Sequence, residues 1–295
     1  MTSEMRSSEI TPTEIMPSET SAGRGGGRAF SPGRLVDRHL GLLSFVALVG
    51  VLETALRVFE VPDYVLPLPS QIFMALVRGF GPPLASPSQF YVNIATTLAE
   101  AVASFVLGSA FGIVAGALVV EFRGVRRLAL PYVIGLQSVP KVALAPLLVV
   151  WFGFGVESKI LLGVLLTFFP LLVNTAAGLS GVERDRIELM ASLKATRWTT
   201  FRLVKFPSAL PYVFAGLEMA AVYAILGAVV GEFVGGNSGL GVLILNRNAA
   251  LDIAGSLATL VVLAFMGIAL QRLVALARAR VLFWAPVPEA LEGGE

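Results

Sequence analysis

Ionisable side chains inside long apolar stretches are the residues of this sequence best placed to do chemistry. Lys141, Glu218 and Glu232 each lie in such a stretch, and Gln137 and Asn174 add uncharged polar groups. Charged groups are costly inside a membrane and mark either a solute pathway or a buried partnership. A lysine can attract an anion, whereas carboxylates and amides can hold other polar groups. These five residues form the candidate solute pathway.

Each candidate also has a structural alternative. Lys141 follows Pro140, so its ammonium group can pair with a carboxylate such as Glu232 or with carbonyl groups freed where a helix breaks. Glu232 can instead belong to a gate at the outer side. Glu218 and the two amides can equally hydrogen-bond between helices. The residue types alone leave these alternatives open.

Two other patterns have local explanations. Glu53 and Arg57 are four residues apart, which favours an ion pair on one helix. Gly108, Gly112 and Gly116 recur every four residues and predict a smooth helix face for close packing. We assign no chemistry to either pattern.

Several kinds of active site are excluded by residue type. The sequence has no cysteine and one histidine, His39, so thiolate sites, disulfides and histidine metal clusters are not expected. It has no Gly-x-x-x-x-Gly-Lys-Ser/Thr loop for binding nucleotide phosphates. A membrane enzyme would need convergent catalytic groups, and no such set is visible. We expect no cofactor on this chain and no enzymatic activity.

The elements that must position the candidates are membrane helices. The chain of 295 residues is 56% hydrophobic and 14% charged, against about a quarter charged in soluble domains. Apolar runs of about 20 residues match a hydrocarbon core, so we predict an all-α polytopic membrane protein with about six transmembrane helices. The predicted spans cover about 40–59, 94–120, 128–150, 158–179, 212–234 and 254–277. Prolines in the third span predict a kink or break.

The basic residues predict the orientation of these helices. Seventeen Lys and Arg residues fall in segments on one side, against Arg78, Lys159 and Arg247 on the other. Under the positive-inside rule, we expect both termini to be cytoplasmic. We expect the membrane to be a bacterial plasma (inner) membrane. We predict a disordered cytoplasmic tail over residues 1–38, a transmembrane domain over 39–280 and a C-terminal cytoplasmic tail over 281–295.

The segment at about 181–211 is amphipathic at helical spacing and lies on the cytoplasmic side. Apolar residues share a face around Ile187 and again around Trp198, and Pro207 ends the second stretch. A helix–turn–helix held between two spans presents a rigid knob that suits a groove on a partner. An amphipathic loop resting on lipid is an equal alternative.

This segment resembles the EAA loop of permease subunits from ATP-binding-cassette importers. The pattern places ATPase coupling on Glu188, Ala191, Lys194, Ala195, Phe201 and Pro207. Further strings are similar to the nitrate/sulfonate/taurine branch of these permeases: 66–70, 139–146, 151–155, 168–174 and 231–241. The resemblance implies a type I importer permease fold that carries a small anionic or polar solute.

The resemblance also implies the partners. Two permease copies would form the pathway, two ATPase subunits carrying ATP and Mg²⁺ would bind the loops, and an extracytoplasmic solute-binding protein would deliver the solute. Membrane lipid surrounds the assembly, and no nucleic acid is expected. A secondary transporter or channel working without an ATPase is the alternative, although such proteins usually show repeated halves and none are visible here.

The loop departs from the family pattern at its turn. Leu189 and Met190 replace the usual two alanines, and Lys194 replaces the usual glycine. Glycine turns the chain without a Cβ clash. Lys194 must therefore adopt a less strained turn or accept a modest cost.

Overall fold

A computed structural model describes residues 33–82, 86 and 88–284, and these residues form helices and connecting segments without any strand. The chain divides into two compact units, residues 1–48 and 49–295. Helix α1 (Gly33–Val58) crosses this division and contains most of the first predicted span. The predicted tails at 1–38 and 281–295 lie largely outside the described residues and stay predictions.

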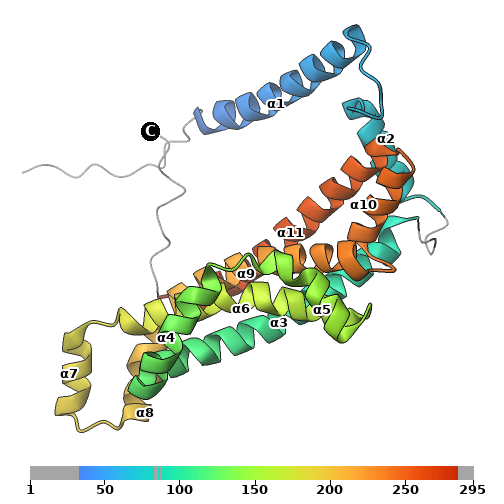
Figure 1. Cartoon of the computed structure of the whole chain (residues 1–295). Helices are drawn as coiled ribbons and strands as arrows, with labels where there is room; N and C mark the ends of the chain where they lie inside the picture. The colour runs from blue at the N-terminus through green and yellow to red at the C-terminus, as the bar shows by residue number, and fades with distance from the viewer. Residues whose placement is uncertain (1–32, 83–85, 87, 285–295) are drawn as a thin grey trace, which may run out of the picture. The chain divides into compact units, whose positions relative to one another are not determined.

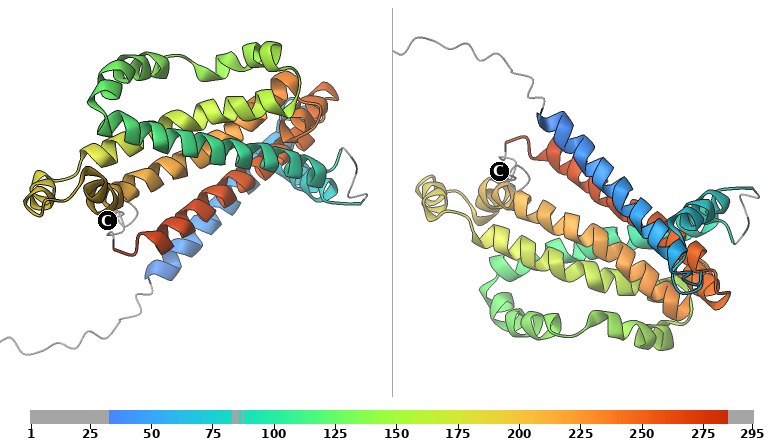
Figure 2. Two further views of the ribbon diagram at one scale, coloured as in Figure 1. Left: turned by 90° about the horizontal axis from the view of Figure 1, so that it is seen from below. Right: turned by 90° about the horizontal axis from the view of Figure 1, so that it is seen from above.

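Four helices of the second unit are long and apolar enough to cross a membrane, counting only the described residues. Helices α3, α6 and α9 lie side by side, with α11 against α9 (Figures 1 and 2). Helix α9 continues from α8 through a π-helical stretch at Phe201–Lys205. The four helices are α3 (Phe90–Glu121), α6 (Val156–Ser180), α9 (Phe206–Gly235) and α11 (Ile253–Val281).

The third predicted span is broken, as its prolines indicated. Helix α4 (Arg123–Gln137) ends before Pro140, and a 3-10 turn then leads into α5 (Ala145–Phe152). The two halves meet at 88°. If this bent pair is one span, up to five spans meet the criterion among the described residues. The all-α polytopic membrane fold is confirmed, and a total of about six spans is compatible with it.

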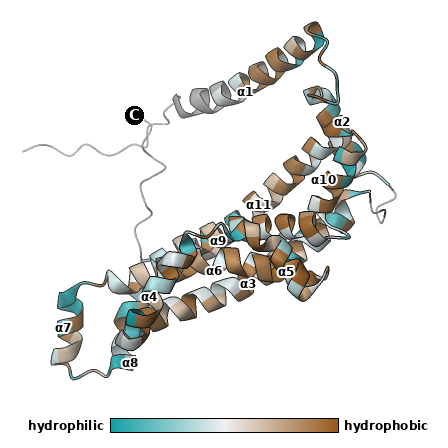
Figure 3. Cartoon of the chain, viewed as in Figure 1, coloured by the Kyte–Doolittle hydropathy of each residue, from teal (hydrophilic) through white to brown (hydrophobic). Residues whose placement is uncertain are grey.

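Short helices complete the second unit. Helices α2 (Pro69–Gly79) and α10 (Leu240–Ala249) both pack near α11, whereas α7 (Arg184–Ser192) and α8 (Arg197–Thr200) form a hairpin at the opposite end. Figure 3 shows hydrophilic residues gathered on this hairpin and apolar residues along the long helices. We call these regions the α10 end and the hairpin end.

The glycine face of α3 packs directly on α6. A Cβ atom on Gly108, Gly112 or Gly116 would lie 2.9, 2.6 or 2.8 Å from backbone carbonyl oxygens of α6. Backbone atoms cannot move aside as a flexible side chain can, so only glycine permits this approach. The predicted packing role of these glycines is confirmed.

Candidate functional site

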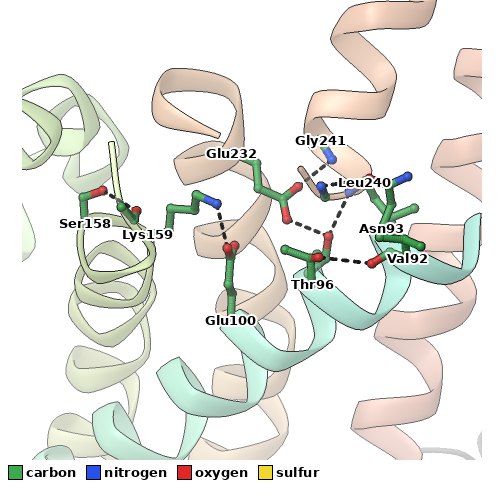
Figure 4. A network of polar contacts seen from close by, with 12 residues as sticks. Val92, Asn93, Thr96, Glu100, Ser158, Lys159, Glu232, Leu240 and Gly241 are labelled. Atoms are coloured by element: carbon green, nitrogen blue, oxygen red, sulfur yellow. Dashed lines mark hydrogen bonds and ion pairs between the residues drawn. The ribbon is translucent and has the colours of Figure 1, made fainter. Parts of the chain in front are cut away.

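A buried ion pair joins α3 to α6 near the α10 end. The Nζ atom of Lys159 lies 2.7 Å from Oε1 of Glu100, and the two side chains are 4% and 2% exposed (Figure 4). The charge count placed Lys159 on the outer side; in the structure it lies in the first turn of α6, where its side chain is buried against α3. Burying a charge is tolerable only with a partner. Each residue therefore requires the other.

Glu232 of α9 lies in the same buried region and is 1% exposed. Its Oε1 accepts a hydrogen bond from Thr97 Oγ1 at 2.6 Å, and its Oε2 accepts one from the Gly241 backbone N–H at 2.6 Å. The Thr97 hydroxyl oxygen in turn accepts from the Leu240 N–H at 2.9 Å. A carboxylate is favourable here, because the first N–H groups of a helix lack intrahelical partners and carry partial positive charge. Glu232 thus fixes the start of α10.

The turn before α10 depends on glycine. Gly239 has φ +119°, a conformation that side-chain-bearing residues rarely adopt. Its N–H donates to Asn93 Oδ1 at 2.9 Å, and a Cβ atom would collide with the Glu232 carboxylate. The suggested pairing of Glu232 with Lys141 is wrong, because Glu232 is held by α3 and α10. A gating role for Glu232 stays a prediction.

Arg247 ties α10 to its neighbours. Its Nη1 atom donates to the Gly255 carbonyl at 2.6 Å and to Thr259 Oγ1 at 2.9 Å, and its guanidinium lies 4.9 Å from the centre of the Phe90 ring. Desolvation by burial lowers the pKa of this guanidinium, and Asp252 partly opposes the shift. The residue therefore serves the packing of α10 and α11.

Three of the predicted pathway residues meet in one hollow of about 350 Å³ between α4, α6 and α9. Gln137, Lys141 and Asn174 line it together with Phe169 and Tyr223. The Lys141 Nζ donates to the Gln137 carbonyl at 3.3 Å and lies 4.6 Å from the centre of the Phe169 ring. A freed backbone carbonyl is therefore its polar partner, one of the two structural alternatives considered. The hollow is therefore lined by the Lys141 cation, by the side-chain amides of Gln137 and Asn174 and by two aromatic rings.

The remaining candidate, Glu218, lies outside this hollow. Its Oε1 is 3.2 Å from Nη1 of Arg278, so it joins α9 to α11. The interhelical alternative is the one observed. The local pair of Glu53 and Arg57 is also present, at 2.6 Å.

The α7–α8 hairpin projects exposed side chains from the other end of the bundle. Glu188 and Lys194 are exposed near its tip, and Leu189 and Leu193 are 60% and 68% exposed. Lys194 has φ +54°, the left-handed conformation that favours glycine. Of the two alternatives for this turn, the structure has the one in which Lys194 accepts a conformational cost.

The predicted coupling residues do not form a single surface. Ala191 and Ala195 line a hollow beside the end of α3, and Phe201 stacks on Trp198 with ring centres 5.7 Å apart. Pro207 lies in the first turn of α9. Of this set, Glu188, Ala191 and Lys194 are exposed, and the other three are partly buried.

Comparison with known proteins decides the family. Residues 108–282, more than half of the chain, match the family described as the binding-protein-dependent transport system inner membrane component. The chain belongs to this family. It is a membrane-spanning permease subunit of an ATP-binding-cassette importer, a transport component rather than an enzyme, and it works with ATPase subunits and a solute-binding protein.

Individual permeases support the assignment. The formylaminopyrimidine transport permease protein ThiX of Halalkalibacterium halodurans is 35% identical over 77% of this chain and 88% of its own length. The riboflavin transport system permease protein RibX of Chloroflexus aurantiacus is 33% identical over 76% and 81%. The taurine transport system permease protein TauC of Escherichia coli is 30% identical over 70% and 75%.

A solved structure supports the fold of this permease. An inward-facing MetNI methionine transporter matches with a TM-score of 0.56 and 21% identity, over 71% of this chain and 97% of that one. The resemblance to importer permeases predicted from sequence is confirmed, and the ATPase-free transporter alternative is set aside. The prediction missed the partnership of Glu100 with Lys159. The sequence did contain a signal for this pair, because Glu100 and Lys159 are an acidic and a basic residue near the ends of two different predicted spans, neither with a local partner.

Proposed function

We propose that two copies of this permease line one solute pathway across a bacterial plasma membrane, with both termini cytoplasmic. Each copy receives one ATPase on its α7–α8 hairpin, and a solute-binding protein delivers the solute at the α10 end. The excess of Lys and Arg in the segments at the hairpin end supports this orientation. The exposed leucines at the hairpin tip support a protein contact there.

The hollow around Lys141 supports a small anionic or polar solute. Among the described residues, Lys141 has no acidic partner, and its polar contact is the backbone carbonyl of Gln137. An unpaired cation beside an amide and aromatic rings favours a solute with a negative group and an apolar or planar part. The named solutes of the relatives, formylaminopyrimidine, riboflavin and taurine, vary widely. We therefore base the proposed class of solute on the chemistry of the pocket and not on the relatives.

The docking proposal is tested by reversing one charge at the hairpin tip. Glu188→Arg introduces a bulky base into the proposed ATPase contact and should reduce co-purification of the ATPase at least tenfold, while the amount of permease in the membrane fraction stays unchanged. Asp185→Arg makes the same charge change on the first turn of α7 and should leave co-purification intact. Normal co-purification and transport with Glu188→Arg would disprove the docking assignment.

A further inference from the structure

An apolar groove opens where the hairpin meets the end of α3. It encloses about 620 Å³ and is lined by Leu118 of α3, by Phe122 directly after α3, by Trp198 of α8 and by Phe201 directly after α8. Trp198 is 68% exposed and Phe122 is 56% exposed. Large aromatic side chains left this open indicate a surface that something apolar covers.

The groove continues an exposed apolar stripe along α3. Leu107, Phe111, Val114, Leu118 and Phe122 follow one another at intervals of four, three, four and four residues, and each is more than 40% exposed. This spacing places them on one helix face. At 1.5 Å per residue the stripe is about 22 Å long, which exceeds the roughly 15 Å depth of one leaflet of a 30 Å hydrocarbon core. A soluble partner cannot follow it into the membrane, whereas an acyl chain can.

A basic hollow adjoins the apolar groove. It encloses about 810 Å³, and it shares Glu121, Phe122 and Arg197 with the groove. Lys205 neutralises Glu121 at 2.6 Å. Arg197 and Arg126 are exposed in this hollow and have no ion-pair partner within the described part of the chain. The hollow therefore carries unbalanced positive charge beside an apolar groove.

We propose that the groove and hollow together bind one anionic phospholipid. An acyl chain lies along the α3 stripe, Trp198 and Phe201 sit at the level of the headgroups, and the phosphate contacts Arg197 and Arg126. Tryptophan is enriched at that level of a membrane, and basic pockets beside spans on the cytoplasmic side bind anionic headgroups. The proposal rests on the orientation given under the proposed function.

This site divides the hairpin between two partners. The tip of α7 is free for the ATPase, whereas α8 rests on lipid, so protein docking and lipid contact describe different halves of one segment. A lipid at this position would also hold the base of the hairpin against α3. A movement of the ATPase at the tip of the hairpin would then be passed to the membrane helices through a base that the lipid holds in place.

The test uses the fluorescence of Trp198 in the full-length permease. The chain has three tryptophans, so Trp151→Phe and Trp284→Phe leave Trp198 as the reporter. Reconstituted vesicles contain brominated phosphatidylglycerol or brominated phosphatidylcholine diluted into unlabelled phosphatidylcholine. We expect brominated phosphatidylglycerol to quench Trp198 at lower lipid fractions than brominated phosphatidylcholine, with a relative affinity about fivefold higher for each arginine that contacts the phosphate. Inorganic phosphate should not compete with the lipid.

Substitutions identify the site. Arg197→Gln should lower the preference for phosphatidylglycerol about fivefold, whereas Arg202→Gln, an exposed arginine outside both hollows, should leave it unchanged. Native mass spectrometry of the permease with its natural tryptophans should show fewer retained phosphatidylglycerol molecules in Arg197→Gln, which checks the result without the tryptophan changes.

Equal quenching by the two lipids would overturn the proposal, and so would loss of all lipid quenching when the ATPase is bound, because a protein would then cover the groove. The lipid preference is measured both with and without the ATPase. Its outcome therefore does not depend on whether Glu188→Arg prevents ATPase docking. Failure of the docking proposal is therefore distinguishable from failure of the lipid site.

Discussion

The two ends of the helix bundle handle polar groups in opposite ways. At the α10 end, Glu100, Lys159 and Glu232 are almost fully buried, and their bonds join the four helices α3, α6, α9 and α10. At the hairpin end, the charged residues of α7 are exposed, and Arg186 forms a local ion pair with the nearby Glu183. Buried groups must find partners within the chain, whereas exposed groups remain available to other molecules. The α10 end is thus built for fixed packing and the hairpin end for association.

The largest effect should come from breaking the buried pair. Lys159→Met leaves the buried Glu100 carboxyl without its partner, and removing one partner of a buried ion pair costs about 3–5 kcal/mol. The expected result is a large fall in the thermal unfolding midpoint of the purified permease in detergent. The double variant Lys159→Met with Glu100→Gln removes both charges and should recover much of the loss. A single variant as stable as the wild type would show that the α10 end does not depend on this pair.

Lys141 provides a second lysine within the spans, and its substitution should separate transport from stability. Lys141→Met removes the cation of a half-buried residue whose polar partner is a backbone carbonyl. Uptake of an anionic solute should fall about tenfold, which corresponds to about 1.4 kcal/mol. The unfolding midpoint and the co-purification of the ATPase should stay near their wild-type values. Lys141→Arg retains the charge and should retain most uptake. Unchanged uptake with Lys141→Met would remove the residue from the pathway.

The smallest effect should lie at the hairpin turn. Lys194→Gly relieves the left-handed conformation at φ +54°, which costs a side-chain-bearing residue about 1 kcal/mol. Amide hydrogen exchange in the turn should slow about fivefold, with no change in the global unfolding midpoint. Lys194→Ala removes the charge but keeps the Cβ atom, so its exchange should match that of the wild type. A change in the global midpoint would mean that the hairpin shares the packing of the bundle.

Local patterns could be predicted from the sequence, and long-range partners could not. The Glu53–Arg57 pair and the glycine face of α3 depend on positions within one helix, and both were predicted correctly. The broken third span followed from its prolines. At Lys194 the sequence left two alternatives, a less strained turn or a conformational cost, and the structure has the second. Gln137, Lys141 and Asn174 were chosen by residue type, and the fold brings them to one hollow.

The missed partnerships share one physical cause. Lys159 was counted as a charge on the outer side and was given no partner. Its partner Glu100 is 59 residues away, and no periodicity within either helix reveals which faces meet. Glu232 was likewise given the wrong partner, because its bond to the Gly241 N–H requires the turn that precedes α10.

The separation between Glu100 and Lys159 also sets an order of assembly. Glu100 belongs to the helix that is synthesised first, and its cation follows 59 residues later. At roughly 5–20 residues per second, the carboxylate waits about 3–12 seconds before that lysine leaves the ribosome. During this interval α3 carries an acidic group whose buried partner has not yet been made, and a buried charge is costly without its partner. We therefore expect α3 to become stable in the membrane together with α6 rather than before it.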